Sequence, residues 1–66
     1  MIVYLTTIRA DQHYVARFHT EAGALIGQAV DRSQAVAEKR ALRQARRWGD
    51  DRNWGSLTIR KGRAAT

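Results

Sequence analysis

The chain has 66 residues, a length that allows one domain with a thin hydrophobic core. Twelve Lys and Arg residues against six Asp and Glu residues give a formal net charge of +6, and ten of the twelve cations are arginine. Because the arginine side chain forks onto phosphates and carboxylates, this composition favours an anionic partner. The absence of cysteine excludes a disulfide framework and a thiolate metal site, and it fits a reducing compartment.

The chain also lacks the usual marks of export and membrane insertion. No apolar run approaches the roughly 20 residues of a membrane span. The first residues contain neither a charged leader nor a cleavage site. We therefore expect a cytoplasmic protein with a single domain over residues 1–66.

Two segments at the start of the chain have the composition of β-strands. Residues 2–9 are rich in β-branched and aromatic side chains, and residues 14–20 alternate in polarity. Residues 10–13 contain no glycine, which favours a four-residue loop built on a type I turn over a tight hairpin turn. A loop of even length places Arg9 opposite Tyr14.

This register divides the predicted hairpin into two faces, because successive side chains of a strand point to opposite sides. One face carries Val3, Leu5, Ala16 and Phe18. The other face carries Tyr4, Thr6, Ile8, Val15, Arg17 and His19. A shift of one residue would exchange the two sets.

Two further short strands are predicted. A second turn leads to a strand over residues 24–30, in which Gly27 marks either a β-bulge or a close approach of another backbone. The last strand is predicted over residues 55–60, with Leu57 and Ile59 on one face.

A helix is predicted over residues 32–48, between the third and fourth strands. Asp31 is the expected N-cap, because Gln34 follows three residues later as in a capping box. Gly49 is expected just past the last helical residue, where glycine is common.

The predicted helix is amphipathic at 100° per residue. Its apolar side is formed by Ala37, Ala41, Leu42, Ala45 and Trp48. Its opposite side carries five cations within nine residues, here called the basic ridge: Lys39, Arg40, Arg43, Arg46 and Arg47.

The element order β-β-β-α-β predicts an α+β domain with one helix packed on one face of a mostly antiparallel four-stranded sheet. Because β-α-β connections are right-handed, the last strand is expected beside the first strand and parallel to it.

The basic ridge is the strongest functional feature of the sequence. Between Lys39 and Arg47 there is no acidic residue, so no ion pair within this segment offsets the repulsion of the cations. Cations spaced by three and four residues can contact successive phosphates of a nucleic acid. The structural alternatives are an ordinary solvated helix face and cations that complement the helix dipole.

One helix covers one face of a sheet, which leaves a second candidate surface on the other face. It combines apolar and basic side chains: Tyr4, Ile8, Val15, Arg17, His19 and Arg60. Such a surface fits a protein partner or a second copy of the chain in a homodimer. The alternative is a small twisted sheet that simply exposes a few apolar side chains.

The sequence does not favour catalysis or metal binding. There is no glycine-rich phosphate loop, and the six acidic residues are scattered along the chain. His13 and His19 are six residues apart, too far to hold one ion without a third ligand from elsewhere. We therefore expect a protein that is not an enzyme and that uses neither a metal nor a cofactor.

Three further residues have candidate roles. Glu38 lies near the apolar side of the predicted helix, where it is expected to pair with a strand arginine. Trp48 and Trp54 could stack on bases, but tryptophans that end a helix and begin a strand favour a role in closing a small core.

A series of residues resembles the amino-terminal arm-binding domain of phage integrases over residues 13–48. The series is Tyr14, Gly23, Ile26, Gly27, Asp31, Arg32, Ala35, Val36 and Glu38. The resemblance implies a three-stranded sheet that enters the DNA major groove, which nominates Arg17 and His19.

The same stretch also resembles HicB-type antitoxins, which neutralise a small RNA-cleaving toxin. The shared residues are Tyr14, Val15, Ala16, Phe18 and Gly23, followed by an alanine-rich helix.

Two functions are consistent with these features. The first is a phage or plasmid accessory protein that binds nucleic acid through the basic ridge. The second is a protein-binding inhibitor or antitoxin, such as a phage-encoded inhibitor of a CRISPR-type host defence complex, that uses the uncovered sheet face. The expected partner is therefore a nucleic acid or a protein complex that handles nucleic acids.

Overall fold

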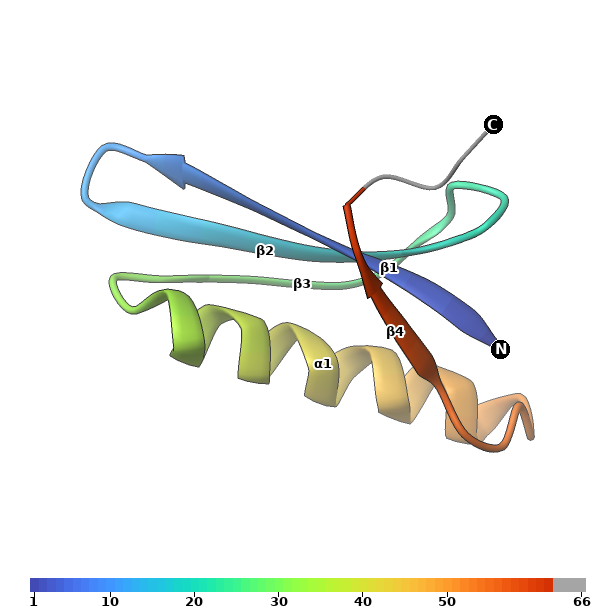
Figure 1. Ribbon diagram of the computed structural model, residues 1–66. Helices are drawn as coiled ribbons and strands as arrows, with labels where there is room; N and C mark the ends of the chain where they lie inside the picture. The colour runs from blue at the N-terminus through green and yellow to red at the C-terminus, as the bar shows by residue number, and fades with distance from the viewer. Residues whose placement is uncertain (63–66) are drawn as a thin grey trace.

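The computed structural model describes residues 1–62 (Figure 1). Its elements are β1 (Ile2–Ala10), β2 (His13–Thr20), β3 (Leu25–Asp31), α1 (Gln34–Asp51) and β4 (Thr58–Lys61). The predicted α+β fold with the order β-β-β-α-β is confirmed. The predicted domain ran to residue 66, and residues 63–66 lie outside the described part of the chain.

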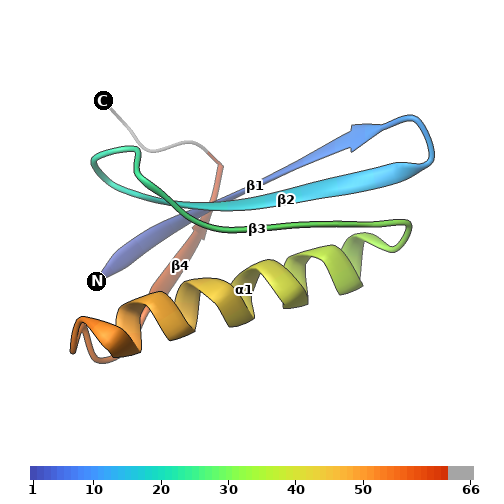
Figure 2. The ribbon, with the colours of Figure 1, turned by 180° about the vertical axis from the view of Figure 1, so that it is seen from behind.

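The four strands form one mixed sheet in the order β3-β2-β1-β4. β1, β2 and β3 are antiparallel, whereas β4 is parallel to β1, with Thr58 opposite Ile2. The position and direction predicted for the last strand are therefore confirmed. Seen from both sides, α1 lies along one face of the sheet (Figures 1 and 2).

The β1–β2 hairpin has the predicted register, with Arg9 opposite Tyr14. The predicted four-residue loop is wrong, because Ala10 also pairs with His13 and leaves a turn of two residues. Asp11 makes this turn possible without glycine: its φ is 56°, and aspartate tolerates the left-handed region better than most residues. The predicted loop of four residues and the observed turn of two residues both have an even length, so the predicted strand register is unchanged.

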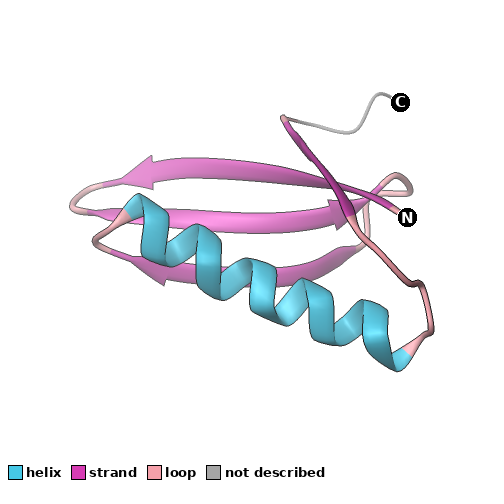
Figure 3. Cartoon of the chain, turned by 60° about the horizontal axis from the view of Figure 1, so that its bottom comes forward, coloured by secondary structure: helices cyan, strands magenta, loops and turns pink. Residues whose placement is uncertain are grey.

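The hydrophobic core lies between the sheet and α1. It contains the four strand residues predicted for the buried face, which are Val3, Leu5, Ala16 and Phe18. It also contains Ile26 of β3 and the helix residues Ala37, Ala41 and Ala45. Leu42 and Trp48 pack at its margin. The small alanine side chains allow the helix to lie close to the strands, and Figure 3 shows α1 lying across the sheet.

Gly27 is the point of closest approach between β3 and α1. A Cβ at this position would overlap the Ala41 carbonyl oxygen and lie 3.1 Å from the Ala45 amide nitrogen. The β2–β3 ladder also shifts register here, because consecutive residues Phe18 and His19 pair with Gly27 and Leu25. Both roles predicted for this glycine, bulge and close approach, are therefore present.

The helix begins two residues later than predicted. Ser33 is the N-cap, and its Oγ accepts a hydrogen bond from the Val36 amide at 3.4 Å. Asp31 is the last residue of β3, and its carboxylate accepts a hydrogen bond from the Ser33 amide at 2.7 Å. Asp and Ser side chains both suit an N-cap. Because β3 continues through Asp31, the helix starts later and Ser33 is the cap.

The helix ends three residues later than predicted. Gly49 is buried inside α1, where its Cβ position lies 3.4 Å from side-chain atoms of Leu57 and Trp54. The residue in the left-handed conformation after the helix is Asn53, with φ 54°. The amide of Trp54 donates to the Gly49 carbonyl at 3.0 Å, as in a Schellman motif.

The connection after the helix has the predicted length of six residues but lies three residues later, over residues 52–57, because α1 ends at Asp51 and β4 begins at Thr58 rather than at residue 55. None of the helical segments in residues 1–62 combines the length and the apolar composition needed to cross a lipid bilayer.

Candidate nucleic-acid interface

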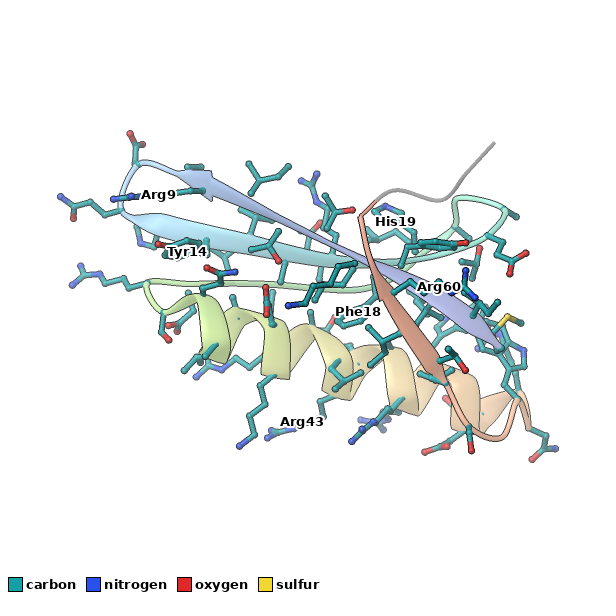
Figure 4. The ribbon with its side chains drawn as sticks, viewed as in Figure 1. Arg9, Tyr14, Phe18, His19, Arg43 and Arg60 are labelled. Atoms are coloured by element: carbon teal, nitrogen blue, oxygen red, sulfur yellow. The ribbon has the colours of Figure 1, made fainter. Side chains whose placement is uncertain are left out.

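The basic ridge lies on the solvent side of α1. All five of its side chains are exposed, opposite the buried alanines. Figure 4 shows Arg43 on the side of the helix that faces away from the sheet. Lys39, Arg43, Arg46 and Arg47 line one shallow depression together with Leu42 and Asp50. The sequence prediction of a continuous outward cationic surface is therefore matched by the geometry.

One member of the ridge has an acidic neighbour. The guanidinium of Arg40 lies 3.8 Å from the carboxylate of Asp31, at the edge of the ridge next to β3. This is the one ion pair within residues 1–62. The other four cations of the ridge thus have no carboxylate within 4.0 Å in the described part of the chain. The nearest acid in sequence is Glu38 for Lys39 and Arg43, and Asp50 for Arg46 and Arg47.

The spacing along the ridge follows the helical repeat. From Lys39 to Arg43 and from Arg43 to Arg47 the rise is about 6 Å each. This corresponds to about two nucleotides of rise along one strand of DNA. A helix laid beside a nucleic-acid strand would bring these cations to a series of phosphates, with the guanidinium groups as bidentate donors.

The helix is held to β1 by a hydrogen-bonded carboxylate on one flank. The Thr7 hydroxyl donates to Glu38 Oε2 at 2.6 Å, and the side-chain Nε2 of Gln34 donates to the same oxygen at 3.1 Å. The Thr7 hydrogen bond holds the pKa of Glu38 below its ordinary value, with smaller contributions from Gln34 and the positive charge of Lys61. The prediction that Glu38 pairs with a strand arginine is wrong, because the strand residue that reaches its carboxylate is Thr7.

The other flank of the helix contacts the edge strand β3. The backbone amide of Gln28 donates to Gln44 Oε1 at 3.1 Å. This bond satisfies a backbone donor on the outer edge of the sheet. Hydrogen bonds on both flanks therefore fix the orientation of α1, and with it the direction in which the ridge points.

The two tryptophans close one end of the core. The rings of Trp48 and Trp54 meet edge to face, with centroids 4.5 Å apart, and both pack against the core cluster. The Arg52 guanidinium lies over the Trp48 ring, 3.4 Å from its centroid. The structural role predicted for the tryptophans is confirmed.

The second candidate surface lies on the sheet face opposite α1, here called the open face. The strand register places all six predicted residues on it: Tyr4, Ile8, Val15, Arg17, His19 and Arg60. In Figure 4, His19 lies on the other side of the sheet from α1 and Arg43. Sequence reasoning missed the part contributed by β3, which consists of Leu25, Gln28 and Val30. The alternation of side chains along β3 was the signal that could have identified them, but the register shift next to Gly27 obscured it.

The described residues contain no group of three His, Asp or Glu side chains that could hold a metal ion. His13 pairs with Ala10 at the hairpin end of β2, and His19 lies six residues further along the same strand. Comparisons of the chain with protein-family models, curated proteins and solved structures found no match.

Proposed function

We propose that this protein is a small, non-enzymatic module that binds nucleic acid through the basic ridge. The observation that supports this most directly is the set of exposed cations without a carboxylate within 4.0 Å in residues 1–62: Lys39, Arg43, Arg46 and Arg47. Mutual repulsion of four cations on one helix face costs stability, and phosphates of a ligand would relieve it.

The ridge suits contacts to the phosphate backbone rather than to bases. Its side chains are long cations on a convex helix, and it includes no Asn or Gln in the ridge positions to read a base edge. Binding would then depend weakly on sequence and strongly on salt. Arg40 contributes less than the others in this proposal because Asp31 already lies beside it.

The biological setting that we propose is an accessory protein of a phage or plasmid. The resemblance to the arm-binding domain of phage integrases supports this setting. In that family the sheet enters the DNA, whereas the ridge of this chain lies on the helix. Our proposal assigns the DNA or RNA contact to the helix.

A filter-binding titration of the full chain with a labelled duplex and a labelled single strand tests the proposal. Reversing two ridge charges in Arg43→Glu/Arg47→Glu should weaken binding at least about tenfold at low salt. The matched control is Arg17→Glu/Arg60→Glu, which changes the net charge by the same amount on the open face. Equal losses in both variants would indicate a net-charge effect and refute a ridge interface. A loss in the control alone would move the interface to the sheet.

A further inference from the structure

The open face carries a continuous row of aliphatic side chains. The register places Ile8 of β1 beside Val15 of β2 and Val15 beside Val30 of β3. Ile8 is 45% exposed and Val30 is 50% exposed. Val15 between them is partly buried. Neighbouring aliphatic residues on three adjacent strands form a patch rather than isolated apolar side chains on a surface.

An arginine whose side chain is restrained by a hydrogen bond lies next to this row, near the centre of the face. Arg17 follows Val15 on the same side of β2, and its Nε donates to Gln28 Oε1 at 2.9 Å. The hydrogen bond restricts the guanidinium group, while its two terminal nitrogens have no partner among residues 1–62. Arginine in such a restrained position loses less entropy when it binds a carboxylate.

A second row borders Arg17 on its other side. It consists of Tyr4, His19 and Leu25, which the register aligns across β1, β2 and β3. Leu25 is 50% exposed. Arg17 itself is flanked across the sheet by Thr6 and Gln28, and the two rows border it along the strands. An arginine between apolar and aromatic side chains is a common composition of an energetic centre in a protein interface.

The open face has one sign of charge. The side chains that the four strands direct to this side include Arg17, Arg60, His13 and His19, but no Asp or Glu. A complementary partner therefore needs carboxylates placed among apolar side chains.

We infer that the open face binds an acidic protein surface, with a partner carboxylate received by Arg17 and aliphatic partner side chains covering the row of Ile8, Val15 and Val30. A second copy of the chain is a poor occupant, because it would bring arginines toward arginines on a face without acids. Nucleic acid is also a poor occupant, because its interfaces are polar and the aliphatic row offers nothing to phosphates.

This inference goes beyond the proposed nucleic-acid contact and does not depend on it. The ridge and the open face lie on opposite sides of the molecule, so occupation of one leaves the other accessible (Figure 4). If both surfaces are used, the module connects a nucleic acid to an acidic protein.

Selection from a random peptide library displayed on phage, with the full chain as bait, tests the inference. The enriched peptides should combine Asp or Glu with aliphatic or aromatic residues. They should bind Arg17→Ala at least about tenfold more weakly than the parent chain. They should bind the ridge variant Arg43→Ala/Arg47→Ala as well as the parent, which separates this site from the ridge. Thermal unfolding of each variant, followed by circular dichroism and compared with that of the parent chain, distinguishes a loss of binding from a loss of fold.

Three results would overturn the inference. The first is a selection without enrichment, or one whose peptides carry no acidic residue. The second is peptide binding that the ridge variant abolishes and Arg17→Ala leaves intact. The third is a dimer in sedimentation equilibrium that Ile8→Asp dissociates, because a second copy would then be the occupant of the face.

Discussion

Gly27 shows how one residue sets the distance between the helix and the sheet. Any side chain there would meet the backbone of α1, which cannot move away without opening the core. We expect Gly27→Ala to destabilise the protein by about 1–3 kcal/mol, the usual cost of overpacking. Urea unfolding of the variant and the parent measures this difference.

Gly49 provides the matched control for that substitution. It also lies at a packed position, but its Cβ would meet side-chain atoms of Leu57 and Trp54 at 3.4 Å instead of backbone. Because alanine favours a helix over glycine by about 1 kcal/mol, Gly49→Ala should be neutral or stabilising. Equal destabilisation by both substitutions would contradict the special role of Gly27.

Glu38 gives the stability of the protein a dependence on acid pH. Its pKa is lowered in the folded state, mainly by the hydrogen bond from Thr7, so its ionised form stabilises the fold. This contribution is present above the ordinary pKa of glutamate and is lost as the pH falls through the lowered folded pKa.

Glu38→Gln should therefore be less stable than the parent chain at about pH 7, and the difference should shrink toward about pH 3. Thr7→Val should show the same loss at neutral pH, because it removes the principal donor. Urea unfolding at the two pH values tests this, and a difference that is independent of pH would be inconsistent with the assigned cause.

At the scale of the element, the end of α1 depends on Asn53. It holds the left-handed conformation that glycine usually holds after a helix. Asn53→Ala should cost about 1–2 kcal/mol because a Cβ disfavours this conformation, whereas Asn53→Gly should be neutral or stabilising. Thermal denaturation of the pair measures the contrast, and a similar effect of both substitutions would argue against the assigned cap.

The strands could be predicted from the sequence because their signal is local. Alternation at residues 14–20 and the even turn determine which side chains are buried, whatever the exact shape of the turn. The helix ends could not be predicted in the same way. Asp31 and Ser33 both suit an N-cap, and Gly49 suits either a helix end or a buried contact. Only the packing of Trp54 and Leu57 against Gly49 decides this point.

The candidate surfaces were predictable to different degrees. The basic ridge follows from the helical repeat alone, so all five cations were assigned to one face. The partners of Glu38 and Arg17 were not predictable, because Thr7 meets Glu38 only where α1 packs on the sheet, and Gln28 meets Arg17 only through the register of β3. Contacts between distant segments depend on tertiary geometry that no single sequence pattern reports.

At the scale of the whole molecule, the fold is a thin two-layer sandwich with different chemistry on its two outer sides. The helix side presents cations over a base of alanines, and the open face presents aliphatic rows around Arg17. The core between them is small and rests on alanines, Phe18 and Val3. The side chains of both proposed surfaces therefore belong to the same few elements that hold the fold together.

The salt dependence of nucleic-acid binding tests the ridge assignment most directly. If Lys39, Arg43, Arg46 and Arg47 each neutralise one phosphate of B-form DNA, the slope of log K against log salt should be about −3.6. Arg43→Ala should reduce the magnitude of this slope by about 0.9, and Arg17→Ala should leave it unchanged. A slope near zero, or an equal reduction in both variants, would contradict the account.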